Sequence, residues 1–263
     1  MKLKYQPTEP LKQTPHIVAF LDFLGASEKM RDPKENNKFL QSINYVYSFA
    51  NYIHKDMKKS YKSNIKIKIF SDNIIIATEI QDTKNIMGYF ANIEHFSLLL
   101  YMNALLNHNI IRGAISIGNL YMDDTLVYGE ALLNAFNGES KIANYPRIII
   151  ERTIFDYISK EMLNLCNFLE VDEVIREDID GELYLNPFWG IALLDGGKSK
   201  VEQYLRRNGS FILHEYKKLL AKNKTTVFPK YHWLANQFNE YCHANNHPFL
   251  INLDKLTLEG KNE

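Results

Sequence analysis

Cysteine is scarce in this chain of 263 residues: Cys166 and Cys242 are the two it has, and their spacing fits no metal-binding pattern. Reduced thiols, as in a cytoplasmic protein, are therefore expected in place of a disulfide framework. The sequence has no uncharged apolar run of the ~20 residues that a membrane span needs, and its first residues lack the hydrophobic core of a secretion signal. Lys plus Arg and Asp plus Glu each total 31, so no positive excess favours a nucleic-acid partner.

The composition predicts a folded protein with a sizeable core, because 46% of the residues are hydrophobic and 13% are aromatic. Residues 1–15 carry three prolines and no hydrophobic periodicity, so we expect a tail there. One domain is expected over residues 16–150. A mainly helical extension packed on it is expected at 151–250, and a second tail at 251–263.

Along residues 16–150, segments with hydrophobic patterns typical of strands alternate with segments typical of helices. Residues 17–21 are uninterrupted apolar sequence, as in a strand covered on both faces. Ile65, Ile67 and Ile69 alternate with Lys66 and Lys68, as in a half-exposed strand. Further strands are expected at 74–77, 110–118, 126–128 and 147–150, and helices at 34–59, 85–107 and 130–143.

This order of elements favours an α+β fold, a sandwich of a ferredoxin-like, mostly antiparallel sheet with helices on one face. Beyond residue 151 the pattern changes. It predicts an irregular acidic stretch at 172–180 and helices near 153–168, 198–222 and 228–244.

Two aspartates stand where predicted strands end. Asp22 follows the run 17–21, and Asp72 lies in a Ser-Asp-Asn turn between two strands. Two such carboxylates can jointly hold divalent metal beside a triphosphate, because Mg²⁺ favours one or two carboxylates plus phosphate oxygens. The alternative is that both are ordinary turn residues, since Asp and Asn are common in turns.

The motifs, taken in order, resemble the class III nucleotidyl cyclase catalytic domain. That family opens with Phe-x-Asp-Ile-x-Gly-Phe-Thr, and Phe20-Leu-Asp-Phe-Leu-Gly-Ala-Ser27 keeps the Asp, the Gly and a hydroxyl residue. Its second aspartate matches Asp72. Its Arg-x-Gly-Ile-x-x-Gly strand is similar to Arg112-Gly-Ala-Ile-Ser-Ile-Gly118, and its Gly-x-x-Val-Asn-x-Ala-x-Arg-Leu-Glu is echoed by residues 129–139.

Variant details resemble a subgroup, the bacterial pyrimidine cyclases of Pycsar anti-phage systems. They include Phe-Ser-Asp-Asn-Ile at 70–74 and, in the extension, Asp178-Ile-Asp-Gly-Glu-Leu-Tyr-Leu185 and Lys230-Tyr-His-Trp-Leu234. The resemblance implies an enzyme that makes cyclic UMP, or in second place cyclic CMP, from the nucleoside triphosphate. It also implies a head-to-tail homodimer with shared sites, two divalent cations (Mn²⁺ or Mg²⁺), and a product that acts on a separate effector.

Site residues follow from the same resemblance. Asp22, Asp72 and the Phe23 carbonyl would hold metal, and the backbone of Phe23, Leu24, Gly25, Ala26 and Ser27 would receive the phosphates. The alternative for Gly25 and Ser27 is a plain helix start. Lys68 occupies the position that reads the base, or else it is a solvated strand lysine.

The chain departs from the family at two catalytic positions. The transition-state arginine is replaced by Asn137, and the ribose-orienting asparagine by Leu133, with Asn134 beside it. Arg147 is a candidate replacement cation, although an arginine before a strand is more often a surface residue. Two rival functions stay open. One is a degenerate cyclase homologue that senses nucleotide; the other is a different two-metal enzyme, such as a diguanylate cyclase-like protein, whose Gly-Gly-Asp/Glu-Glu-Phe turn is absent here.

Overall fold

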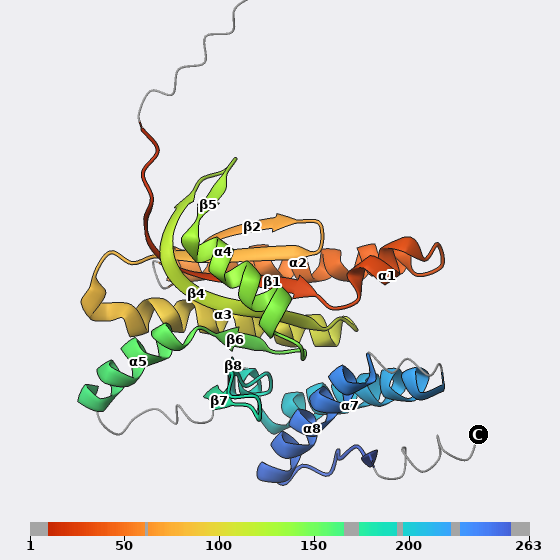
Figure 1. Cartoon of the computed structure of the whole chain (residues 1–263). Helices are drawn as coiled ribbons and strands as arrows, with labels where there is room; N and C mark the ends of the chain where they lie inside the picture. Colours follow the sequence, from red (N-terminus) through yellow and green to blue (C-terminus); the bar gives the residue numbers. More distant parts are fainter. Residues whose placement is uncertain (1–9, 61–62, 166–173, 194–196, 222–226, 254–263) are drawn as a thin grey trace, which may run out of the picture.

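The computed structural model describes residues 10–60, 63–165, 174–193, 197–221 and 227–253 (Figure 1). Its strands are β1 (Thr14–Phe23), β2 (Lys66–Phe70), β3 (Asn73–Glu79), β4 (Ile111–Met122), β5 (Val127–Gly129), β6 (Ile148–Ile150), β7 (Ile175–Glu177) and β8 (Leu183–Leu185). Its α-helices are α1 (Ala26–Arg31), α2 (Asn36–Ser60), α3 (Ile86–Leu106), α4 (Glu130–Asn137), α5 (Arg152–Leu165), α7 (Gly197–Ala221) and α8 (Phe228–Ala244). Two short 3₁₀ segments, η1 (Thr83–Asn85) and η3 (Trp189–Leu193), and a π-helical turn, η2 (Gly138–Ile142), complete the described elements.

The strands form one sheet in the order β2-β3-β1-β4-β6-β8-β7, with β5 paired to β4. Among the described strands, the β4–β6 pair is parallel and every other pair is antiparallel. The expected α+β fold with a mostly antiparallel sheet is confirmed. Within the described residues, no helix combines the length and the apolarity needed to cross a membrane.

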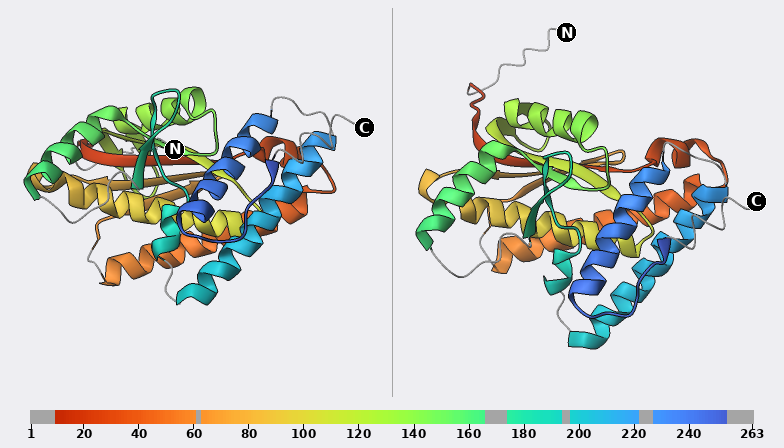
Figure 2. Two further views of the ribbon diagram at one scale, coloured as in Figure 1. Left: turned by 90° about the horizontal axis from the view of Figure 1, so that it is seen from below. Right: turned by 60° about the horizontal axis from the view of Figure 1, so that its bottom comes forward.

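Strand β1 is central and is covered on both faces, as its apolar run predicts. Ile17, Ala19 and Leu21 belong to the large core that includes α2 and α3, whereas Val18 and Phe20 belong to a second core with Ala131 and Ala135 of α4. Figure 2 shows α4 on one side of the sheet and α2 and α3 on the other. The prediction that the helices share one face therefore holds for α2 and α3 but not for α4.

The extension beyond residue 150 has the three expected helices, although residues 166–168 of the first and residue 222 of the second lie outside the described residues. It also adds strands to the sheet, because β8 pairs with β6 and β7 with β8. The described part of the acidic stretch thus contains β7, where irregular structure was predicted. A strand of three residues is too short to show an alternating pattern, so nothing in the local sequence indicates β7. The division of the chain into a domain and an extension stays a prediction.

Candidate active site

Asp22 and Asp72 lie together at one end of the sheet. Asp22, the penultimate residue of β1, is paired in register with Asn73 of β3 and with Arg112 of β4. The neighbouring Phe23 N–H donates to the carbonyl of Asp72 at 3.3 Å. Burial raises the pKa of Asp22 to about 6; Arg112 opposes this rise and the charge of Asp72 adds to it. The structure thus places two electrostatically coupled carboxylates where the sequence predicted them.

The turn that carries Asp72 is held in a strained conformation. Ser71 has a φ of 53°, which non-glycine residues rarely adopt. The Tyr47 hydroxyl of α2 donates to the Ser71 carbonyl at 2.6 Å, and the Ser71 hydroxyl donates to Asp72 Oδ1 at 2.8 Å. The first bond ties the turn to α2 and the second lies within the turn, so Asp72 is held in a defined position beside Asp22.

The loop after Asp22 leaves open space next to its backbone. Gly25 has a φ of +78°, and a Cβ added there would meet nothing within 4 Å. Leu24 is tied back by its N–H, which donates to the Ile110 carbonyl at 2.8 Å. Ala26 is buried and Ser27 is exposed as α1 begins. The glycine therefore meets a conformational requirement and also permits a close approach to the backbone.

Arg112 and Glu139 join this corner, although the sequence did not mark either as a site residue. Arg112 Nε lies 2.6 Å from Glu139 Oε1 and 3.5 Å from Asp22 Oδ2. Burial raises the pKa of Glu139 to about 7, against the lowering effect of Arg112. Burial lowers the pKa of Lys230 of α8, and the charge of Arg112 lowers it further. The charges of Glu139 and Asp22 oppose this lowering, so Lys230 lies near the same corner. Aligning the two strands would have found Arg112, since it stands directly opposite Asp22.

Lys68 shares a face of β2 with Lys66, as the alternating pattern predicts. Its cross-strand partner Ile75 belongs to the core beneath α4, so the two lysines lie on that face of the sheet. Lys68 Nζ donates to the carbonyls of Asp123, at 3.1 Å, and Asp124, in the turn between β4 and β5. The ammonium group therefore already binds acceptors of the carbonyl type.

Asn134 and Asn137 of α4 line a cavity of about 430 Å³ between this helix, β4, β6 and the start of β8. Glu151, Arg152 and Glu182 are further polar residues in its wall. Neither Asp22 nor Asp72 lines the same cavity. One chain thus presents the amides and the paired carboxylates at two separate places.

Arg147 does not lie in the candidate site, so its prediction as a substrate-binding cation is wrong. Its side chain is fully buried and forms ion pairs with Asp178 and Asp180 in the turn between β7 and β8. Asp178 also accepts from the Trp233 indole N–H at 2.8 Å, and the Arg147 guanidinium lies over the Tyr145 ring at 5.2 Å. The guanidinium is thus paired with carboxylates and packed on aromatic rings, and these contacts attach the extension to the sheet.

The donor set at Asp22 and Asp72 fits a cation that arrives with a ligand. Among the described residues, no group of three or more His, Cys, Asp or Glu side chains is arranged to hold a metal ion. Two carboxylates and the Phe23 carbonyl are too few to enclose a metal. They are the kind of oxygen ligands that Mg²⁺ or Mn²⁺ completes with phosphate oxygens and water.

The raised pKa of Asp22 gives a prediction for stability. Its pKa rises from 3.8 to about 6 on folding, so the folded chain binds this proton more tightly and loses stability as pH rises through that range. The amide in Asp22→Asn cannot ionise. We expect the free energy of unfolding of Asp22→Asn, relative to the unsubstituted chain, to increase by about 1–2 kcal/mol between about pH 4 and pH 7. Urea denaturation without divalent metal measures it, and a difference independent of pH contradicts the assignment.

Comparisons with known proteins give limited likeness. No protein-family model matches the chain. The phenylalanine–tRNA ligase beta subunit of Mycoplasma pneumoniae is 23% identical over 175 residues, which cover 60% of this chain and 21% of that protein. The chain therefore spans about a fifth of the length of that relative. Among solved structures, the adenylyl cyclase CyaB from P. aeruginosa is similar, with 14% identity and a TM-score of 0.43 over 67% of this chain and 95% of that one. Neither likeness carries an argument about activity.

Proposed function

We propose that this chain is a nucleotidyl cyclase, which converts a nucleoside triphosphate to a 3′,5′-cyclic monophosphate and pyrophosphate. The observation that carries the proposal is the pair Asp22 and Asp72 at neighbouring strand ends, beside an open glycine loop and the cation Arg112. Held there, two divalent cations, Mn²⁺ or Mg²⁺, would lower the pKa of the ribose 3′-hydroxyl and offset the charge of the triphosphate.

The protein's own part in this reaction is positioning and charge stabilisation. The N–H groups of Gly25, Ala26 and Ser27 would receive the phosphates, because those of Phe23 and Leu24 already donate to the carbonyls of Asp72 and Ile110. Gly25 would let the phosphates approach the backbone closely. Arg112, next to Asp22, would supply positive charge toward the leaving pyrophosphate. Asn137 can donate a hydrogen bond but has no charge, so Arg112 is the cation best placed to offset the missing transition-state arginine.

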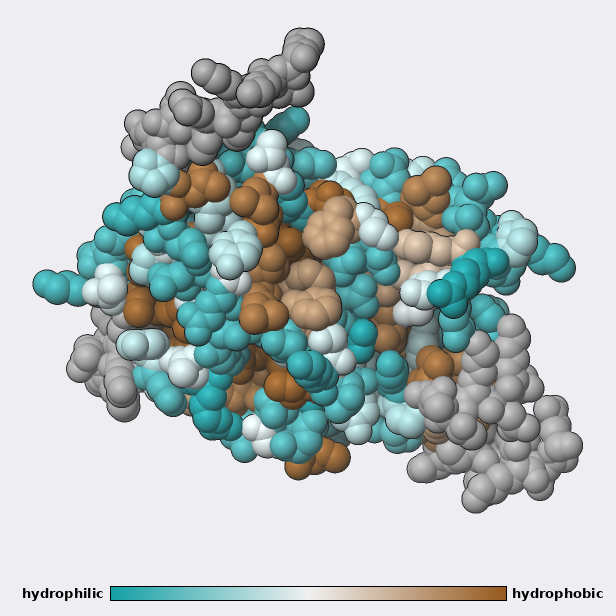
Figure 3. Space-filling model, turned by 45° about the horizontal axis from the view of Figure 1, so that its top comes forward, coloured by the Kyte–Doolittle hydropathy of each residue, from teal (hydrophilic) through white to brown (hydrophobic). Residues whose placement is uncertain are grey.

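A homodimer would bring the separate parts of the site together. In this arrangement Asn134 and Asn137 of one chain would face Asp22 and Asp72 of the other across the face that carries α4. Apolar exposure on that face supports it, because Tyr128, Leu133 and Phe136 are 64%, 58% and 45% exposed. Figure 3 shows hydrophobic side chains gathered across the middle of the molecule, and a large apolar surface of this kind favours a protein partner.

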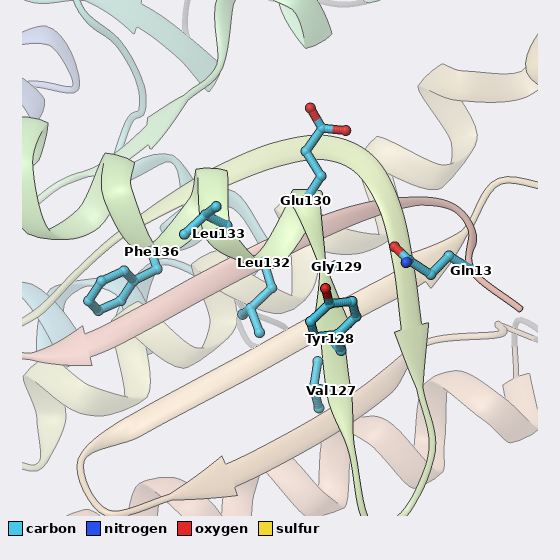
Figure 4. Close-up of a pocket in the computed structure, with 8 residues that line it drawn as sticks. All are labelled: Gln13, Val127, Tyr128, Gly129, Glu130, Leu132, Leu133 and Phe136. Carbon is cyan, nitrogen blue, oxygen red and sulfur yellow. The ribbon is translucent and has the colours of Figure 1, made fainter. Parts of the chain in front are cut away.

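A hollow of about 460 Å³ lies within the proposed interface. Figure 4 shows that Leu132, Leu133 and Phe136 come from α4 and Val127 and Tyr128 from β5, with Gln13 just before β1. Glu130 extends away from the apolar side chains. A second copy of this chain would cover these side chains without burying that carboxylate.

Leu133→Asp tests the dimer. A carboxylate in an apolar interface is costly to desolvate, so the variant is expected to be monomeric by sedimentation and to lose at least ~90% of any cyclase activity of the native chain. Tyr157→Asp on α5 is the matched control, because Tyr157 is 50% exposed at another place. A Leu133→Asp protein that stays dimeric and active contradicts this arrangement.

The proposed substrate is UTP, with CTP second. Lys68 already donates to two backbone carbonyls, and uracil offers two acceptors of the same kind in O2 and O4. The exocyclic amine of cytosine is a donor, and leaving it unpaired in a closed site costs ~1–3 kcal/mol. Adenine is disfavoured because Leu126 stands where the resemblance places the adenine-binding carboxylate. Guanine is disfavoured because Lys68 stands where guanylyl cyclases have a glutamate. The same resemblance suggests that the product signals to a separate effector in anti-phage defence.

Incubation of the purified chain with UTP, CTP, ATP or GTP and Mn²⁺, followed by chromatography, tests the activity. We expect cyclic UMP to form fastest. Binding of a nucleotide without turnover would favour the alternative of a sensor, which the replacement of the transition-state arginine by Asn137 supports. Formation of cyclic AMP or cyclic GMP in preference would overturn the proposed base selectivity and leave the cyclase reaction standing.

A further inference from the structure

Arg112 lies between two carboxylates that differ in burial. Its Nε is 2.6 Å from Glu139 and 3.5 Å from Asp22, and the exposed fractions of these two side chains are 4% and 18%. An arginine guanidinium and a metal ion can each bind the carboxylate of Asp22. Arg112 is therefore a potential competitor of the cation that the proposed function needs at Asp22.

Glu139 is the carboxylate that Arg112 contacts more closely. A buried carboxylate that loses its cation pays a large desolvation cost, whereas Asp22 is partly solvated. The closer contact of Arg112 is with Glu139, and its contact with Asp22 is the longer one. With a neutral side chain at 139, Asp22 would be the carboxylate closest to Arg112 among the contacts described.

The backbone around Glu139 is held close to the sheet. Glu139 lies in the π-helical turn η2, directly after α4, and such turns are frequent at functional sites. A Cβ at Gly138 would lie 2.7 Å from Ala114 Cβ of β4, so the turn approaches the strand as closely as a glycine permits. Ala143 N–H donates to the Gly138 carbonyl at 2.9 Å and closes the turn. The position of Glu139 is therefore fixed relative to Arg112, two residues before Ala114 on β4.

We propose that Glu139 is a positioning residue that draws Arg112 away from Asp22 and so keeps this carboxylate available to a divalent cation. The proposal rests on the metal role that the proposed function gives to Asp22. It adds a residue that touches neither metal nor substrate. It also links η2, at the end of the proposed dimer helix α4, to the metal-binding carboxylate.

A double-mutant cycle tests the proposal with Mn²⁺ alone as the probe. Mn²⁺ affinity is measured by electron paramagnetic resonance for the native chain, Glu139→Gln, Arg112→Gln and the double variant, without nucleotide. Glu139→Gln is expected to weaken Mn²⁺ binding ~10-fold or more, the range seen for residues that support a metal ligand. Arg112→Gln in the same chain is expected to restore it, because no guanidinium is left to occupy Asp22.

Urea denaturation of the same four proteins separates positioning from a merely structural role. A structural role lowers stability and Mn²⁺ affinity together, whereas positioning changes the affinity of protein that stays folded. Glu177→Gln, in an exposed ion pair with Arg152, is the control and should bind Mn²⁺ as the native chain does. If Glu139→Gln does not fold, Glu139→Ala, which also removes the charge, takes its place in the cycle. Equal affinity in the native chain and the position-139 variant, or a double variant no better than the single one, overturns the proposal. Since no nucleotide is present, failure of the cyclase assay leaves the result unaffected.

Discussion

Asp22→Asn and Asp72→Asn are each expected to reduce cyclic nucleotide formation at least ~1,000-fold. The amide keeps the shape of the carboxylate but removes the charge that holds a divalent cation, and little other chemistry compensates, because the reaction depends on positioning and charge. Both variants should also lose the rise in melting temperature that Mn²⁺ with UTP gives the native chain. Chromatography of the reaction products and thermal unfolding measure the two effects.

The fold of these variants should survive. Asp22 is paired in the β1 ladder through its backbone, and the conversion removes a carboxylate whose pKa burial raises. Asp156→Asn on α5 is the control, because this exposed residue lies far along the chain from both strand ends. Turnover near the native rate in either site variant would end the two-metal proposal, whereas loss of activity in the control would show a general effect on the protein.

Arg147→Ala is expected to lower the free energy of unfolding by about 3–5 kcal/mol, the range for breaking a buried ion pair by removing one partner. The guanidinium is fully buried, and its removal leaves Asp178, whose side chain is 10% exposed, without its cation. It also leaves a space beside Tyr145 and Tyr184, whose rings the guanidinium covers. Urea denaturation measures the change.

The exposed Arg152 provides the comparison. Its side chain is 57% exposed and its contact with Glu177 is 3.7 Å long, so Arg152→Ala should change stability by less than ~0.5 kcal/mol. An Arg147→Ala protein as stable as Arg152→Ala, with a selective loss of turnover, would return Arg147 to the active site. Loss of stability together with a native KM in the folded fraction would support its role in attaching the extension.

Local patterns were enough to predict much of this protein. The unbroken apolar run 17–21 indicated a strand buried on both faces, and β1 has cores on both sides. The alternation of isoleucine and lysine at 65–69 placed the two lysines together on one face, as the register of β2 and β3 has it. Asp22 stands near the end of β1 and Asp72 directly before β3. They come together because the end of β1 pairs with the start of β3 in antiparallel register.

Contacts between distant segments decided the rest. Nothing near Arg147 in the sequence indicates that Asp178 and Asp180 neutralise it, or that Trp233 binds the same carboxylate. The contact of Arg112 with Glu139 joins a strand to a turn after the next helix, and Lys68 reaches carbonyls of a turn 55 and 56 residues away. Periodicity describes which face of its own element a side chain occupies, and it carries no information on which element covers that face.

The sequence by itself therefore determined the strands and the long helices of residues 16–150 and the two carboxylates at the strand ends, but not the short helix α1 or the π-helical turn η2. Only the tertiary structure decided the face on which α4 packs and which cations are free. Burial makes this distinction. Arg147 is fully enclosed with two aspartates and is part of the framework, whereas Arg112, although paired with Glu139 and Asp22, stays partly exposed. Whether an arginine is neutralised depends on the carboxylates around it, and only folding brings these distant residues together.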